Sequence, residues 1–181
     1  MVEVLTGFLF ALALWRYGLS AEFAVTIFYC CIFIVIMFID LEHRLILNRV
    51  TYPAAAAALI ISIFYPQPDG LIGGVPGVTN HIIGGAFGFI FFLAVATIRP
   101  GGMGWGDVKL AGLIGLVAGM PLVVVSLFLG IVTGGVVAVA LLLIKIRKRK
   151  ESVPYAPFLG SGLIIALIWG QSILDWYLDL V

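Results

Sequence analysis

Two aspartates, Asp40 and Asp107, stand at the ends of long apolar stretches, where an acidic side chain is unusual. Asp107 follows a glycine-rich segment, 101–106, and glycine permits close approach by another part of the chain. Ionisable residues are costly in membrane helices, so both aspartates are candidates for a functional role. Asp107 is also expected in the first turn of a helix, where the helix dipole favours a carboxylate without any catalysis.

If the two aspartates converge, they can activate water. Neighbouring carboxyl groups do not both ionise easily, so they share a proton. The ionised group can take a proton from a water that attacks a peptide carbonyl, and the protonated group can polarise that carbonyl and then protonate the leaving amine. This chemistry needs no metal and we expect no cofactor. Asp40 and His43 have a spacing that a metal could use, but no third ligand matches them.

The composition excludes a water-soluble domain. Hydrophobic residues make up 63% of the 181 positions and charged residues only 10%, and the mean hydropathy is +1.23. Soluble domains carry about 25% charged residues. We therefore expect a polytopic membrane protein that contacts lipid and binds no nucleic acid, with residues 1–181 forming a single integral-membrane domain.

Apolar runs predict an all-α fold with about seven transmembrane helices. A spanning helix needs about 17–25 mainly apolar residues. The candidate runs are 3–19, 22–40, 51–66, 80–98, 105–120, 121–144 and 157–178. We interpret the short fifth run as a full span, because a re-entrant segment there would move the basic cluster 145–150 to the outer side. With this topology Asp40 and Asp107 lie on the same face at similar depth.

Lysine and arginine set the orientation, since they are enriched on the cytoplasmic side of membrane proteins. If the N-terminus is cytoplasmic, only Arg16 falls outside. All other cations then fall inside, namely Arg44, Arg49, Arg99, Lys109 and the cluster 145–150. We therefore predict that both aspartates face the cytoplasm.

Three segments, in this order, resemble the type IV prepilin peptidases, which are intramembrane aspartyl proteases with a GxGD signature. The signature is similar to Gly104-Trp105-Gly106-Asp107. The first-aspartate segment of that family resembles Ile39-Asp40 and the following residues 45–51. The family's Ile-Pro-Phe-Gly-Pro-Phe-Leu segment resembles residues 153–159, although Tyr155-Ala156 replaces Phe-Gly, and Leu47 stands where the family usually has proline.

This resemblance implies an endopeptidase in the cytoplasmic membrane of a prokaryote. It would cleave the short basic leader from prepilin-like, pseudopilin-like or flagellin-like precursors, with Asp40 and Asp107 as the catalytic pair and no metal. As supporting or substrate-binding residues we select Gly104, Gly106, Lys109, Asn48 and Pro157. The cysteine-rich segment associated with N-methylation is not found in this sequence, so we expect the short, peptidase-only form. Methylation and homo-oligomer formation are left open.

Two other classes compete with this interpretation. A rhomboid-like serine protease could use Ser161, which lies between two glycines, but it needs a histidine base, and His43 and His81 are the only histidines. A non-catalytic transporter, channel or pilus-assembly component is the second alternative. Transporters place ionisable residues near the membrane midplane on broken helices, whereas these aspartates lie at span ends.

Overall fold

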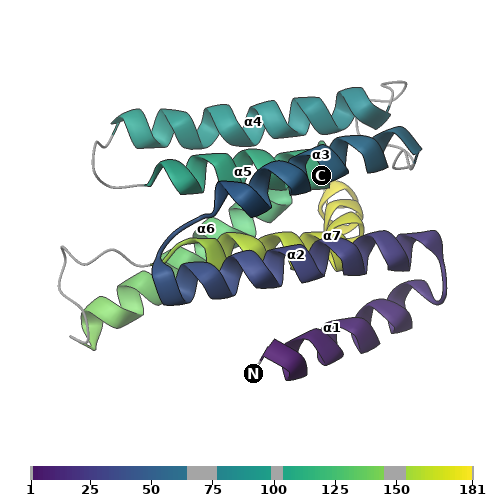
Figure 1. The fold of residues 1–181 in the computed structure, drawn as a ribbon, viewed down its shortest axis with the longest axis horizontal. Coiled ribbons are helices and arrows are strands. Elements are labelled where there is room, and N and C mark those ends of the chain that lie inside the picture. The colour runs from purple at the N-terminus through teal and green to yellow at the C-terminus, as the bar shows by residue number, and fades with distance from the viewer. Residues whose placement is uncertain (1, 65–76, 99–103, 145–153, 181) are drawn as a thin grey trace.

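The computed structural model describes residues 2–64, 77–98, 104–144 and 154–180, and all elements in these ranges are α-helices (Figure 1). The helices are α1 (Val2–Tyr17), α2 (Ala21–His43), α3 (Asn48–Phe64), α4 (Gly77–Ile98), α5 (Trp105–Ala118), α6 (Leu122–Leu143) and α7 (Ala156–Leu178). The predicted all-α fold with seven helices is confirmed. The predicted loop 66–79 and the basic cluster 145–150 lie largely or wholly outside the described residues.

Four of these helices, α2, α4, α6 and α7, are long and apolar enough to cross a membrane. The apolar helix α3 is shorter, with 17 residues. Helix α5 has 14 residues and rises only about 21 Å, which is less than the ~30 Å of a hydrocarbon core. It ends at Ala118 because Gly119 takes a left-handed φ of 66° and turns the chain. The expected span 105–120 is therefore the shortest helix of the seven.

Helix α5 lies at the centre of the fold. Nine of its 14 residues are buried, and it packs against α3, α4, α6 and α7. Its contact with α4 is made by facing glycines: a Cβ on Gly115 would overlap the Gly84 carbonyl, and a Cβ on Gly88 would overlap the Ala111 carbonyl. Small residues at a helix contact allow two backbones to approach closely in lipid.

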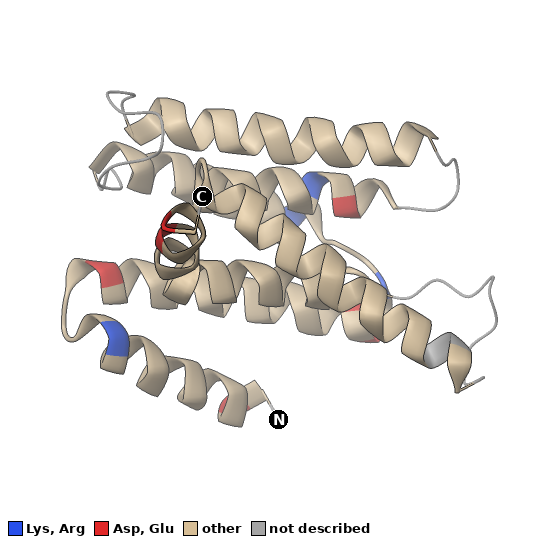
Figure 2. Cartoon of the chain, turned by 180° about the vertical axis from the view of Figure 1, so that it is seen from behind, with Lys and Arg blue, Asp and Glu red and all other residues tan. Residues whose placement is uncertain are grey.

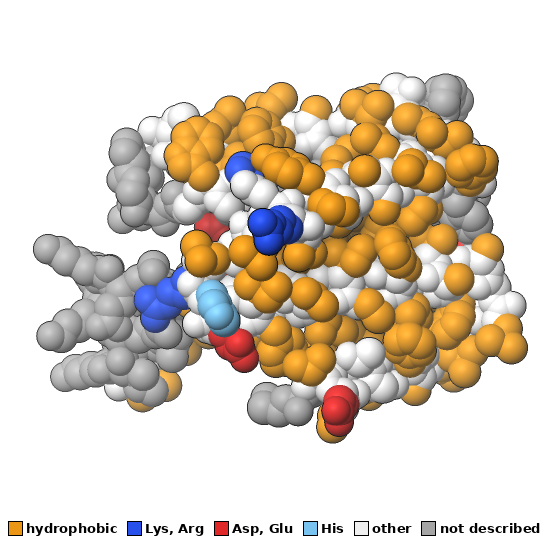
Figure 3. Space-filling model, in the orientation of Figure 1, with side chains coloured by type: hydrophobic (Ala, Val, Ile, Leu, Met, Phe, Trp, Pro, Cys, Tyr) orange, Lys and Arg blue, Asp and Glu red, His pale blue; other side chains and the backbone are white. Residues whose placement is uncertain are grey.

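The outer surface is apolar, as expected for a protein surrounded by lipid. Hydrophobic side chains cover most of the face shown in Figure 3, and large exposed ones include Trp15, Phe64 and Val136. Figure 2 shows that the charged residues lie toward the ends of the helices. The chain is thus a multi-pass membrane protein whose polar groups gather at the two ends of the bundle.

Candidate active site

Asp40 lies in the last turn of α2 and is almost completely buried, with 5% of its surface exposed. Its Oδ2 accepts a hydrogen bond of 3.1 Å from the backbone N–H of Ala156, the first residue of α7. The N-cap residue of α7, Tyr155, makes no side-chain cap of its own. The carboxylate of α2 therefore caps α7, and the N-terminus of α7 compensates for burying a negative charge.

Asp107 lies in the first turn of α5 and is half-buried. Its Oδ2 accepts a hydrogen bond of 3.3 Å from the backbone N–H of Gly104, and its own N–H donates to the Gly104 carbonyl at 3.1 Å. These two bonds fix the carboxylate beside the start of its helix. The expected placement of Asp107 in a first helical turn is confirmed.

Both carboxylates line one cavity of about 350 Å³. The other lining residues come from the α2–α3 connection, from the start of α5 and from the segment before α7: Arg44, Leu45, Ile46, Gly104, Gly106, Pro154 and Tyr155. The structure thus brings together two side chains that are far apart in the sequence. If both were ionised they would repel each other across this cavity, which favours sharing of one proton.

The supporting residues selected from the sequence fall into two groups. Gly104 and Gly106 line the cavity, and a Cβ on Gly106 would lie only 3.1 Å from the Ile46 Cβ. Lys109 and Asn48 do not line it. Instead, Lys109 Nζ donates a hydrogen bond of 3.1 Å to Asn48 Oδ1 and lies 5.8 Å from the ring centre of Tyr52. This contact ties α5 to the start of α3, directly after the connection that lines the cavity.

Pro157 also does not line the cavity; it occupies the first turn of α7, next to Ala156. The residues that do line it there are Pro154 and Tyr155, which the sequence analysis did not select as site residues. The ring of Tyr155 packs against Phe92 and Phe158 at centroid distances of 6.4 and 6.3 Å. The signal for both residues was present, because they belong to the segment 153–159 that carried the resemblance.

The serine and histidine residues on which the competing interpretations depend do not line the aspartate cavity. Ser161 Oγ donates to the Phe158 carbonyl, and His81 Nδ1 lies 2.8 Å from the Leu116 carbonyl oxygen. Each is thus bonded to the backbone and not to the other. His43 is exposed, with its Nδ1 3.9 Å from Glu42 Oε2, whereas Asp40 points into the protein. Within the described residues no three potential metal ligands come together.

Comparison with known proteins identifies the family. Residues 27–139, which include both aspartates, match the type IV leader peptidase family. The chain belongs to the type IV leader peptidase family. It is 31% identical over 181 residues to a prepilin leader peptidase/N-methyltransferase from Bacillus subtilis, an alignment that covers 98% of this chain and 68% of that protein.

Two other relatives carry the same name. One, from Pseudomonas putida, is 29% identical over 96% of this chain and 59% of its own length; the other, from Xanthomonas campestris, is 27% identical over 98% of this chain and 61% of its own length. The chain therefore spans about three fifths to two thirds of the length of these three relatives. No solved structure matches this chain significantly.

Proposed function

We propose that this chain is an aspartyl endopeptidase that removes the short basic leader from type IV prepilin-like precursors. Asp40 and Asp107 are the catalytic pair, and the reaction takes place at the cytoplasmic face of a prokaryotic plasma membrane. The observation that carries the proposal is that both carboxylates line one cavity, in a chain of the leader peptidase family. The names of the relatives support prepilins as the substrates.

The mechanism follows from two carboxyl groups that share one proton. The ionised aspartate removes a proton from a water molecule while the water oxygen attacks the peptide carbonyl. The protonated aspartate donates its hydrogen to the carbonyl oxygen as negative charge develops there. When the carbon–nitrogen bond breaks, the proton taken from water passes to the leaving amine. Both carboxylates lie beside a helix N-terminus, which stabilises the negative charge that the pair carries.

The distribution of cations supports the cytoplasmic assignment. Arg44 lines the aspartate cavity, and Arg49 and Lys109 lie at the same end of the bundle, beside Asn48. Arg16, the remaining described cation, lies at the C-terminal end of α1, beside α7 residues near its far end. Because lysine and arginine are enriched on the cytoplasmic side, this distribution supports a cytoplasmic location for the aspartate end. The start of α1 then lies on the same side.

The test is cleavage of a co-expressed prepilin, followed as a change in precursor size on a gel. Asp40→Asn and Asp107→Asn should each abolish cleavage while the protein still inserts into the membrane. Asp179→Asn is the matched control, because Asp179 is an exposed aspartate at the C-terminal end of α7. Full cleavage by either active-site variant would contradict the two-acid mechanism. A precursor that stays uncut with the wild-type protein would instead favour a non-catalytic role in the membrane.

The relatives are also named N-methyltransferases. The two carboxylates supply a mechanism for peptide cleavage. The mass of the cleaved product reports on methylation in the same experiment, because a methylated N-terminus is heavier than a free one.

A further inference from the structure

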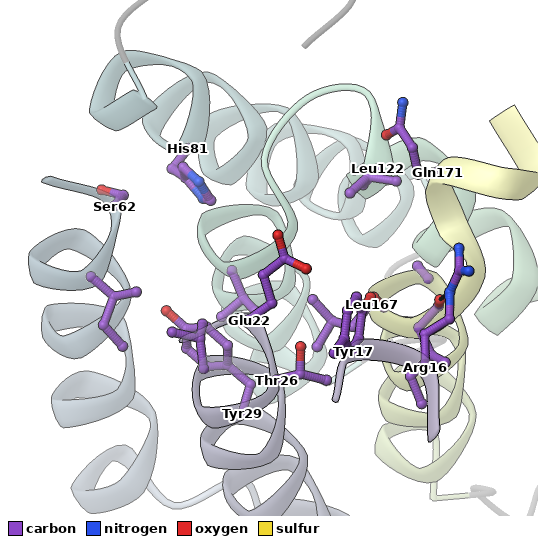
Figure 4. Close-up of a pocket in the computed structure, with 15 residues that line it drawn as sticks. Arg16, Tyr17, Glu22, Thr26, Tyr29, Ser62, His81, Leu122, Leu167 and Gln171 are labelled. Carbon is purple, nitrogen blue, oxygen red and sulfur yellow. Dashed lines mark hydrogen bonds between the residues drawn. The ribbon is translucent and has the colours of Figure 1, made fainter. Parts of the chain in front are cut away.

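A second cavity, of about 360 Å³, lies at the end of the bundle opposite the aspartates (Figure 4). It is formed where α1 ends and α2 begins, together with the last turns of α3 and α5, the second turn of α4, the first residue of α6 and the middle of α7. Its volume falls within the range of about 300–1,000 Å³ in which small-molecule sites are found. It shares no lining residue with the aspartate cavity.

Polar groups are concentrated in this cavity. Three of the seven buried polar or charged side chains in the described chain, Thr26, Ser62 and His81, line it. Buried polar side chains in a membrane protein are costly unless they have partners. A cavity that collects them in an otherwise apolar bundle therefore points to a polar occupant.

His81 is a buried polar residue in the wall of this cavity. Its side chain is 95% buried, since the residue is only 5% exposed, and its Nδ1 lies 2.8 Å from the Leu116 carbonyl oxygen. A carbonyl oxygen only accepts hydrogen bonds, so Nδ1 carries the hydrogen and Nε2 carries a lone pair. Nε2 is buried and has no hydrogen-bond partner among the described residues. Because Nε2 has almost no accessible surface, a ligand in the cavity does not reach this atom, and the ring serves as part of the cavity wall.

The charged groups of the cavity specify the ligand further. Glu22 and Arg16 both line it, yet they form no ion pair with each other. Arg16 is instead held by two hydrogen bonds, from Nε to the Ile168 carbonyl at 3.3 Å and from Nη2 to Ser172 Oγ at 2.9 Å. These bonds use two of the five guanidinium donors and orient the group, so Nη1 is left to bind an anion.

The cavity therefore offers a carboxylate for a cation and a guanidinium for an anion. In the view of Figure 4, Glu22 lies between His81 and Arg16. A carboxylate and a guanidinium that line the same cavity suit a ligand in which an ammonium group, near Glu22, is joined to a phosphate, near Arg16. Trp15 and Leu19, beside the cavity in sequence, are 79% and 91% exposed and apolar, and tryptophan is enriched at membrane interfaces.

We propose that this cavity binds the phosphoethanolamine headgroup of a phospholipid, with the ammonium held by Glu22 and the phosphate by Arg16. The acyl chains lie along the apolar outer surface near Trp15. The site is separate from the proposed peptidase site, and its occupancy is measured by lipid binding and not by cleavage.

The test is binding of defined lipids to the purified full-length protein in detergent, measured by native mass spectrometry and by thermal stabilisation. Phosphatidylethanolamine should bind to the protein and stabilise it against thermal unfolding. Phosphatidylcholine carries the same phosphate but no N–H donor, so it should bind about tenfold more weakly, the loss expected for one charge-assisted hydrogen bond. Phosphatidylglycerol, which has no ammonium group, should also bind weakly. Equal binding of the three lipids would overturn the proposal.

Soluble phosphoethanolamine distinguishes the headgroup from the whole lipid. Binding of phosphatidylethanolamine that the soluble compound fails to displace identifies the lipid as the ligand. Displacement by the soluble compound shows that the headgroup supplies the recognition, which also supports the site. Binding of the soluble compound without any binding of the lipid would overturn the lipid assignment.

Two variants locate the site. Glu22→Gln should weaken binding of phosphatidylethanolamine about tenfold, whereas Glu3→Gln should leave it unchanged. The control is matched, because Glu3 and Glu22 are both exposed acids in the first turn of a helix and only Glu22 lines the cavity. Arg16→Gln should weaken phosphatidylethanolamine and phosphatidylcholine alike, since both carry the phosphate. Equal effects of the two glutamate variants would place the lipid elsewhere.

Discussion

The carboxylate of Asp40 accepts a hydrogen bond of 3.1 Å from the backbone N–H of Ala156, a residue 116 positions later in the chain. This bond joins the end of α2 to the start of α7 and makes one of the two proposed catalytic acids a structural cap as well. Removal of the Asp40 carboxylate should therefore affect both the stability of the protein and the cleavage reaction. Different substitutions of Asp40 can separate these two effects.

Asp40→Ala should lower the free energy of unfolding by about 1–3 kcal/mol, because it leaves the Ala156 N–H buried without a partner. Asp40→Asn keeps an oxygen that can accept this hydrogen bond and should be nearly as stable as the wild type. Neither variant should cleave a prepilin. Denaturant unfolding in detergent measures the stability, and a gel measures the cleavage. Equal destabilisation by alanine and asparagine would show that the cap does not contribute to stability.

Gly115→Ala should disrupt the contact between α4 and α5. The added Cβ would overlap the Gly84 carbonyl, and overpacking of this kind costs about 1–3 kcal/mol. The matched control is Gly135→Ala in α6, where a Cβ would meet nothing within 4 Å; this change should be neutral or slightly stabilising, since alanine is the better helix former. Thermal unfolding in detergent compares the two variants, and the opposite order would refute the close contact.

Lys109→Met should slow cleavage without a large loss of stability. Lys109 binds Asn48 at 3.1 Å and so holds the start of α3 beside α5, next to the connection that lines the aspartate cavity. The loss of one exposed hydrogen bond to a charged group should cost no more than about 1 kcal/mol of stability. Arg49→Met removes a neighbouring exposed cation and serves as the control. If both variants cleave prepilin at the same reduced rate, the effect comes from surface charge and not from the Asn48 contact.

Gly106→Ala should reduce cleavage because its Cβ would press against Ile46 at 3.1–3.3 Å, on the wall of the cavity beside Asp107. Ile46→Ala in the same chain removes two of the three crowded atoms, Cγ1 and Cδ1. The double variant should therefore recover part of the cleavage rate that the single variant loses. Initial rates of prepilin cleavage in membranes measure this recovery. An additive loss in the double variant would mean that Ile46 contributes more by packing than it costs by crowding.

The sequence by itself determined the class of the protein and singled out the two acids that we propose as the catalytic pair. Spanning-length apolar runs and a charge content of 10% predict a helical membrane protein, because these signals depend only on local composition. The boundary between the runs 105–120 and 121–144 and the entry of Asp107 into a first helical turn are local as well. Two predicted helices separate Asp40 from Asp107, one that leads away across the membrane and one that returns. This was enough to expect both aspartates at one end of the bundle.

Only the tertiary structure decided how the acids are held and what surrounds them. Asp40 binds Ala156 and Lys109 binds Asn48, and neither pairing has a local signal, because each joins helices whose packing is set by the whole bundle. The same reason explains why Pro154 and Tyr155, and not Pro157, line the aspartate cavity. The second cavity depends on packing among five or more chain segments, so the buried lone pair of His81 could not be read from the order of the residues.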